Sequence, residues 1–344
     1  MKFWTGIYDF KQTQYNVRNF GYILIFIFLL TACGKKEIQI GKIDPSSGAI
    51  NEVTIVIEDS LWNGAAGDSI RKVLAAPIAE ISAPEPIFDL AQYSPKNFGH
   101  RAKMSRNIIL LSENESHQFV LKKSLYATPQ NFFFIREKNP EEMTKAFISQ
   151  ADSIIKTFKQ TELNEQQLFI AKNPLQAIDS VKEWFAMTIK VPETYQIKEN
   201  IKNEIVWFQK DLHSGDVNLL IYEVAIPENH VEINHNIDEI LEMRDLIIEQ
   251  YIYGNQPDSY IYTDYNFVPV VYMRNQKKLP AVEIRGKWAM ENDFMTGPFI
   301  SLVIKDDYYG RYLFLDGFVN NSFQNKRNQL LELEAIIKSI NFYE

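Results

Sequence analysis

Two loops in the N-terminal half carry side chains that could bind a ligand. In residues 59–68 a strand pattern leads through two glycines toward a helix, whose first backbone N–H groups could bind an anion. Asp59 and Asp68 bound this stretch, and Trp62 could supply an apolar wall. A tight turn with a capping aspartate and a core tryptophan explains the same residues. We favour that interpretation, because two acids would repel an anion.

A short basic segment follows in the same half. Arg101 and Arg106, with Lys103 between them and His100 before them, could bind a phosphate or carboxylate group. A solvated loop is the favoured alternative for this segment.

A third group lies near the C-terminus. Arg285, Trp288 and Asp293 frame an expected turn between two strands, where they could converge on a ligand. A β-turn closed by an aromatic side chain explains the same residues and is the favoured reading.

Glycoside hydrolysis would require two carboxyl groups about 5–10 Å apart across a groove. The candidate pairs are Asp59 with Asp68 and Asp293 with Asp306. The sequence contains no His-Glu-x-x-His, Gly-x-Ser-x-Gly, phosphate-loop or dinucleotide-binding signature. We therefore expect no catalytic set and no cofactor.

Histidines also give little indication of a metal site. Among the five, only His230 and His235 are close in sequence, and their spacing matches neither a helix face nor a strand face. A solvated loop is favoured, and no metal ligand is predicted.

Tyrosines crowd the segment 251–265. Such amphipathic rings suit a glycan or peptide surface or a partner interface, although ordinary packing of a tyrosine-rich loop is slightly favoured. They are Tyr251, Tyr253, Tyr260, Tyr262 and Tyr265.

The N-terminus carries a targeting pattern. Arg18 closes a mildly basic leader, the apolar run 22–30 is too short to span a bilayer, and Leu30-Thr31-Ala32-Cys33 follows. This resembles the lipobox of bacterial lipoproteins. The resemblance implies cleavage before Cys33 and acylation of that residue by diacylglycerol and a fatty acid such as palmitate. Gly34, in place of an aspartate, favours the outer membrane.

Composition limits the classes of partner. The 344 residues carry a net charge of −8, and 46% are hydrophobic. A moderately acidic chain without a basic stripe argues against nucleic-acid binding, and its apolar content can build a sizeable core. Cys33 is the single cysteine, so no disulfide within the chain is possible.

The chain divides into four predicted segments. These are a signal peptide (1–32), an acylated cysteine with a flexible tether (33–50), an N-terminal α+β domain (51–172) and a C-terminal α+β domain (173–344). The polar residues 160–180 favour this boundary. The predicted fold class is α+β, with mostly antiparallel sheets and helices packed on one face.

Hydrophobic periodicity predicts the elements of both halves. The expected strands are 52–57, 107–111, 131–136, 184–191, 204–210, 217–226, 267–273, 281–288, 299–305 and 311–319. The expected helices begin at Asp68, near Pro140, at Asn236 and near Gln324.

The two halves end alike. Ile154-Ile155-Lys156-Thr157-Phe158 parallels Ile336-Ile337-Lys338-Ser339-Ile340, each in an expected helix. A distant duplication is one hypothesis. Convergent patterning of helix ends is the alternative.

Several short motifs are shared with a known family. They are Asn51-Glu52-Val53, Asp59-Ser60-Leu61-Trp62, Ser105-Arg106-Asn107-Ile108, Gly297-Pro298-Phe299 and Asp316-Gly317-Phe318-Val319, followed by Lys326-Arg327. Together they resemble an uncharacterised lipoprotein family of Bacteroidetes, a domain of unknown function. The resemblance implies an envelope location and a globular fold over nearly all of the mature chain. It implies no catalytic residues.

These observations favour a non-catalytic envelope lipoprotein. We expect a membrane-anchored binding or assembly factor that faces the periplasm, with an envelope protein or a glycan as its partner. The alternatives are a cell-wall or glycan hydrolase with paired carboxylates, and a carrier of an apolar ligand.

Overall fold

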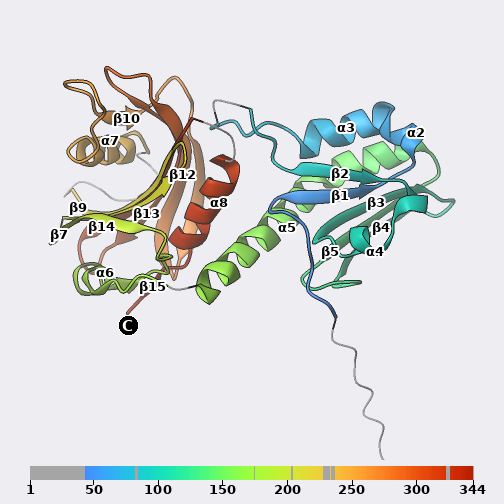
Figure 1. Cartoon of the computed structure of the whole chain (residues 1–344), viewed down its shortest axis with the longest axis horizontal. Coiled ribbons are helices and arrows are strands. Elements are labelled where there is room, and N and C mark those ends of the chain that lie inside the picture. Colours follow the sequence, from blue (N-terminus) through green and yellow to red (C-terminus); the bar gives the residue numbers. More distant parts are fainter. Residues whose placement is uncertain are drawn as a thin grey trace, which may run out of the picture. The chain divides into compact units, whose positions relative to one another are not determined.

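A computed structural model describes residues 43–81, 84–173, 175–202, 204–227, 233, 237–322 and 326–343. Cys33, the predicted leader, His230 and His235 lie outside the described residues. Residues 44–344 form one unit that contains two large, separate β-sheets (Figure 1). Among the described residues, no helix has the length and apolar character needed to cross a membrane.

The N-terminal sheet has the strand order β2-β1-β3-β5-β4. Its strands are β1 (Glu52–Val56), β2 (Asp89–Tyr93), β3 (Asn107–Glu113), β4 (Gln118–Lys123) and β5 (Asn131–Glu137). β1 runs parallel to β2 and β3, β3 runs parallel to β5, and β4 pairs antiparallel with β5. Parallel strands are buried on both faces, which explains the continuous β-branched sequence of β1.

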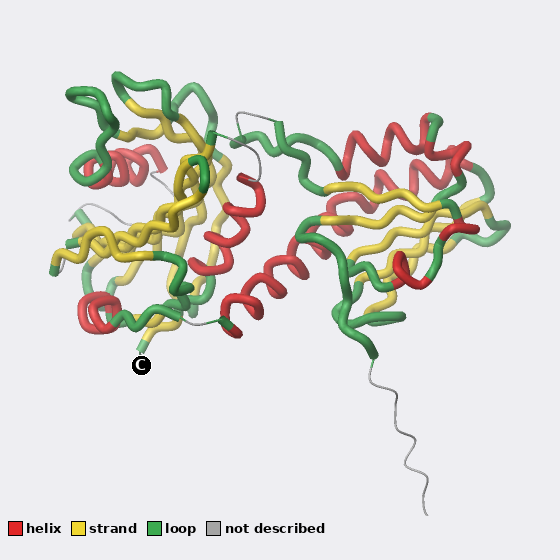
Figure 2. The backbone as a smooth tube through the Cα atoms, in the orientation of Figure 1, coloured by secondary structure: helices red, strands yellow, loops and turns green. Residues whose placement is uncertain are grey.

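Helices cover one face of this sheet (Figure 2). They are α2 (Asp59–Trp62), α3 (Ala65–Leu74) and α5 (Pro140–Lys172). Ile70 of α3 and Phe147 and Ile154 of α5 pack on the inner residues of β1, β3 and β5. The other face has a smaller apolar cluster, near the short helices η1 (Pro95–Asn97) and α4 (His100–Lys103).

Helix α5 is much longer than its sequence suggested. Asn139 caps it, because the Asn139 side chain accepts a hydrogen bond from the Glu142 N–H at 2.9 Å. Residues 160–172, part of the polar stretch 160–180 expected at the domain boundary, continue the helix for a total of 33 residues. Glu162 is buried on the side of α5 that faces the N-terminal sheet. A charged residue therefore lies where an amphipathic helix would usually place an apolar one.

The C-terminal sheet is antiparallel throughout, with the order β10-β12-β13-β14-β9-β8-β7 and β11 paired to β12. Its strands are β7 (Gln196–Ile201), β8 (Ile205–Leu212), β9 (Gly215–Ala225), β10 (Ile261–Thr263), β11 (Val270–Gln276), β12 (Leu279–Met290), β13 (Thr296–Asp306) and β14 (Arg311–Asn321). A separate two-stranded sheet joins β6 (Met187–Thr188) to β15 (Asn341–Phe342).

Each face of the C-terminal sheet packs against its own helix (Figure 1). Leu219 and Ile221 of β9 contribute to the core shared with α8 (Lys326–Ile337). Leu220 and Tyr222, on the opposite side of the same strand, contribute to the core shared with α7 (Ile237–Ile248). Because side chains alternate along a strand, a strand apolar at every position needs cover on both faces.

The α+β class is therefore confirmed, and the sheets are mostly antiparallel when taken together. The mostly parallel N-terminal sheet is the exception, and helices lie on both faces of the C-terminal sheet. The duplication hypothesis is wrong, because the two strand orders are unrelated. Ile154–Phe158 lie inside the long helix α5, whereas Ile336 and Ile337 end α8. The four-part domain division stays a prediction.

Two local predictions also differ from the structure. Helix α6 (Asp179–Phe185) occupies the start of the expected strand 184–191, and Ala186, with a φ of 53°, ends it. Helix α3 begins at Ala65 after Gly64, so Asp68 lies inside its first turns and does not cap it.

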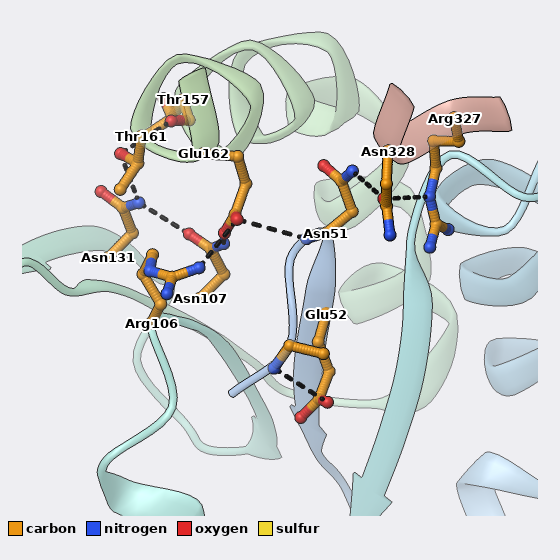
Figure 3. Close-up of polar contacts among 11 residues, drawn as sticks. Asn51, Glu52, Arg106, Asn107, Asn131, Thr157, Thr161, Glu162, Arg327 and Asn328 are labelled. Carbon is orange, nitrogen blue, oxygen red and sulfur yellow. Dashed lines mark hydrogen bonds and ion pairs between the residues drawn. The ribbon is translucent and has the colours of Figure 1, made fainter. Parts of the chain in front are cut away.

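A buried carboxylate fixes the middle of α5 to the N-terminal sheet (Figure 3). Glu162, 1% exposed, accepts hydrogen bonds from Arg106 Nη1 at 2.7 Å and from Asn107 Nδ2 at 2.7 Å. It also accepts one from the Asn51 backbone N–H at 3.2 Å. The ion pair with Arg106 compensates the cost of burying this charge.

Contacts from the N-terminal sheet region also reach α8. Both carboxylate oxygens of Glu85 accept hydrogen bonds from the backbone N–H groups of Lys326 and Arg327, each at 3.0 Å. Glu85 thereby satisfies two N–H groups at the start of α8 that have no partner within the helix. Asn51 Nδ2 donates to Asn328 Oδ1 at 3.0 Å (Figure 3).

Replacing Glu162 with glutamine should lower the free energy of unfolding by about 3 kcal/mol, because the partly buried Arg106 charge loses its charged partner. Urea unfolding followed by circular dichroism measures this change. Asp152→Asn, at an exposed position of the same helix, is the matched control and should change stability by less than about 0.5 kcal/mol. Equal stabilities of the two variants would contradict the role assigned to Glu162.

Candidate functional site

A pocket at one end of the C-terminal sheet gathers aromatic and amide side chains. Its volume is about 230 Å³. Its lining residues are Trp207, Gln209, Asp216, Asn218, Tyr251, Ile252, Tyr253, Ile261, Trp288, Met290, Met295, Phe318 and Asn320. Such a mixture of apolar walls with a few polar groups is typical of small-molecule sites.

The strand pattern explains why these residues meet. Alternate residues of β9 and β14 face the α7 side of the sheet, and the polar ones fall where β9 begins and β14 ends. Asp216 pairs with Asn320 in this register, and Asn218 pairs with Phe318. Helix α7 ends at Ile248, so the segment that follows brings Tyr251 and Tyr253 to the pocket.

Hydrogen bonds order the polar side of the pocket. Asn218 Oδ1 accepts from Trp207 Nε1 at 2.9 Å and from Gln209 Nε2 at 3.2 Å. Asn218 Nδ2 donates to Asp216 Oδ1 at 2.5 Å, and Asn320 Nδ2 donates to Asp216 Oδ2 at 3.3 Å. Each oxygen of Asp216 keeps an acceptor site for a further donor, because a carboxylate offers about four.

Asp216 is the one carboxylate among the lining residues, and its pKa is shifted. Burial raises the pKa of the Asp216 carboxyl, and the hydrogen bonds from Asn218 and Asn320 oppose this change. The charge of Asp211, its register partner on β8, raises the pKa further, and Lys198 lowers it. A half-buried acid with a raised pKa in a pocket is a common mark of a functional site.

Trp288 is a buried aromatic residue of the pocket lining. Its Nε1 donates to the Val319 carbonyl at 3.2 Å, and its ring meets Phe318 edge to face at 5.7 Å between centroids. Gly297 makes this approach possible, because a Cβ there would lie 2.1 Å from the Val319 carbonyl oxygen and 2.8 Å from Trp288 Nε1.

Residues 59–68 do not form an open anion site. Asp59 Oδ1 accepts from Gln92 Nε2 at 2.9 Å, and Asp68 pairs with Arg71 at 2.7 Å. The Arg71 guanidinium also lies over the Trp62 ring, 4.5 Å from its centroid. The two carboxylates and the tryptophan ring of this stretch thus contact Gln92 and Arg71, which lie outside it.

The basic side chains of residues 101–106 lie in different surroundings. Arg101 is exposed on α4, whereas Arg106 turns inward to Glu162. The Lys103 ammonium lies over the rings of Phe98 and Tyr126, at 5.7 and 5.3 Å from their centroids. These cations therefore do not share one ligand position.

The C-terminal trio is separated by the alternation of strand β12. Arg285 faces α8, where it pairs with Glu334 at 2.7 Å, while Trp288 faces the pocket on the other side of the sheet. Asp293 lies in the turn that follows, and its Oδ1 accepts from the Phe294 N–H at 2.7 Å. Of these three residues, Trp288 alone lines the pocket.

The expected carboxylate pair Asp293 and Asp306 does not form a catalytic arrangement. Asp293 precedes β13 and Asp306 ends it, so the 11-residue strand separates them. At about 3.3 Å per residue, this separation is roughly 30 Å, far beyond the distance that glycoside hydrolysis needs. Among the described residues, no three His, Cys, Asp or Glu side chains are grouped so that they could hold a metal ion.

Part of the tyrosine-rich segment 251–265 lines the pocket. Tyr251 and Tyr253 line the pocket, and Tyr253 forms an isolated antiparallel bridge with Tyr260. Tyr265 instead donates a hydrogen bond to Asp245 Oδ2 at 3.2 Å. Burial, together with the Asp245 charge, raises the pKa of Tyr265 to about 12.

A buried ion pair fixes α7 beside the pocket. Arg244 is 1% exposed, and its Nε donates to Asp316 Oδ1 of β14 at 2.9 Å. Its guanidinium lies over the Phe299 ring, 4.0 Å from the centroid. This contact joins α7 to strand β14.

The polar half of the pocket was not identified from sequence. Its residues come from three strands and meet only because those strands are neighbours in the sheet. They are Gln209, Asp216, Asn218 and Asn320. One sequence signal was present: polar residues interrupt otherwise apolar central strands.

Comparison with protein families covers most of the described chain. Residues 174–339 match a domain of unknown function, DUF4837, and residues 46–170 match a second one, DUF8532. The two matches cover separate, consecutive parts of the chain. The pocket lies in the DUF4837 region, and the Glu162 contacts lie in the DUF8532 region.

Two further similarities are limited in extent. An 86-residue stretch is 31% identical to the epidermin biosynthesis protein EpiB of Staphylococcus epidermidis and covers 24% of this chain but 8% of that protein. A solved structure of a mutant of protein Mog1 shares 7% identity over 46% of this chain and 90% of its own length, with a TM-score of 0.27. Neither similarity supports a functional argument.

The α8 face of the DUF4837 region holds an ion-pair network. Glu283, 1% exposed, contacts Arg285 at 2.8 Å, Arg274 at 3.0 Å and Lys338 at 3.1 Å. Burial alone would raise the pKa of Glu283, but the charges of Arg285, Lys338 and Arg274 outweigh it and lower the pKa to about 2.

This network should make stability depend on pH. Because the pKa of Glu283 is lowered from 4.5 to about 2, its stabilising contribution is complete above about pH 4.5 and is lost as the pH falls toward 2. Urea unfolding should show a loss of up to roughly 3 kcal/mol across this window. Glu283→Gln should flatten the slope, and an unchanged slope would contradict the assignment.

Proposed function

We propose that this protein is a lipid-anchored envelope protein that binds a saccharide in the pocket of its C-terminal sheet. The pocket carries this proposal, because it combines aromatic rings with amide and carboxylate groups. Sugar rings present apolar faces that pack on aromatic side chains and hydroxyl groups that hydrogen-bond to amides and carboxylates. Trp207 and Tyr253 suit the first role, and Gln209 and Asn320 the second.

The size of the pocket supports a small occupant. Its volume of about 230 Å³ falls below the ~300–1,000 Å³ of sites for drug-sized ligands. One sugar ring fits that space better than a long oligomer. Further rings of a glycan would extend past Tyr253, whose side chain is 67% exposed.

Binding is favoured over hydrolysis. Asp216 is the single carboxylate among the lining residues, and Asp211 on the neighbouring strand is not one of them. Hydrolysis requires a second carboxyl group positioned across the scissile bond. A carrier of an apolar ligand is also less well supported, because four amide or carboxylate side chains line the pocket.

The proposed location rests on the lipobox-like sequence at Cys33. Acylation would hold the protein at the membrane, because two or more acyl chains give stable attachment where one gives marginal attachment. We propose the outer membrane, with the folded part facing the periplasm. The resemblance to a lipoprotein family of Bacteroidetes supports this location.

Removing the Trp207 side chain should weaken saccharide binding. We expect Trp207→Ala in the full-length chain to lower affinity at least about tenfold in a screen of neutral and amino-sugar oligosaccharides, because an aromatic face worth about 1.5 kcal/mol or more is lost. Isothermal titration calorimetry measures the change. Trp184→Ala, on α6 away from the pocket, is the matched control. Absence of saccharide binding by the wild type would overturn the proposal.

Substitution of Cys33 should release the protein from membranes. With no thiol to acylate, Cys33→Ala should incorporate no labelled palmitate and should shift from the membrane pellet to the soluble or leader-uncleaved fraction. Metabolic labelling followed by fractionation measures both. Equal labelling of the variant and the wild type would contradict the anchor.

A further inference from the structure

We propose that the saccharide carries a free, protonated amine, and that Asp216 binds this ammonium group inside the aromatic part of the pocket. This inference rests on the proposed saccharide-binding function and specifies its ligand class: an amino sugar that is not acylated on nitrogen. Neutral and acidic sugars would lack the group that complements Asp216.

Charge complementarity is the first argument. None of the 13 pocket residues is a lysine, arginine or histidine, and Asp216 is the one ionisable group besides two tyrosines. Asp211 lies opposite Asp216 across the β8–β9 pair and adds a second negative charge nearby, with Lys198 as the opposing cation. A ligand ammonium would supply the positive charge that the pocket residues lack.

The orientation of Asp216 is the second argument. Its two oxygens accept hydrogen bonds from Asn218 and Asn320, which hold the carboxylate in place while leaving acceptor sites on both oxygens. A primary ammonium group is a donor of three hydrogen bonds. A neutral hydroxyl could fill one of these sites but would bring no charge.

The aromatic lining is the third argument. Trp207, Trp288, Tyr251 and Tyr253 line the same pocket as Asp216. Aromatic ring faces attract cations, and this attraction strengthens where water is displaced. A pocket that places a carboxylate beside several aromatic rings therefore favours a ligand whose ammonium group is attached to a ring with an apolar face.

Burial of Asp216 supports the same ligand. Burial raises the pKa of Asp216, which means that its charged form is disfavoured unless a positive charge lies beside it. A bound ammonium would lower the cost of burying this charge, so part of the binding free energy would come from restored charge neutrality.

Two trisaccharides that differ in their amines test the inference. The probes are β-1,4-linked triglucosamine and tri-N-acetylglucosamine, titrated calorimetrically at pH 6 into the full-length chain in detergent micelles. We expect triglucosamine to bind about tenfold more tightly. Asp216→Asn should reduce this preference to less than about twofold while keeping the affinity for the acetylated probe.

The control is Asp307→Asn, which removes an exposed carboxylate in the turn before β14. It should retain the tenfold preference. Equal binding of the two probes to the wild type, or a preference that survives Asp216→Asn, would overturn the amine inference and leave saccharide binding intact. Failure of both probes, together with the rest of the oligosaccharide screen, would overturn both proposals.

Discussion

The alternation of side chains along the central strands of the C-terminal sheet is the constraint on which the rest depends. Because β9 is apolar on both faces, neither face can remain in contact with water. Helix α8 covers one face and α7 covers the other. The pocket forms beyond the end of α7, where polar residues replace apolar ones at the sheet end.

Buried and partly buried ion pairs then hold the helices in position. Arg244 of α7 pairs with Asp316, and Arg285 of β12 pairs with Glu334 of α8. Glu162 of α5 binds Arg106 in the same manner. Each charge is compensated by a partner from a different element, so these pairs define which elements pack together more specifically than apolar contacts would.

The pocket follows from this arrangement. Its hydrogen-bonded side is preorganised, because Asn218 is bound to Trp207, Gln209 and Asp216 at once. Preorganised polar groups lower the cost of ordering a site on binding. Such a rigid site suits recognition of a small polar ligand, in agreement with the proposed role of an anchored binding protein.

The sequence by itself determined the fold class, the positions of most long strands and the lipobox-like motif, because these depend on local periodicity and short spacing. Tertiary structure decided the rest. Arg285 and Trp288 are three residues apart but face opposite sides of one strand, whereas Asp216 and Asn320 meet through strand pairing. Glu162 belongs to the polar stretch expected at the domain boundary, but in the fold it is buried and accepts hydrogen bonds from Arg106 and Asn107. Contacts between distant residues have no local sequence signal, since they arise from strand order and helix packing.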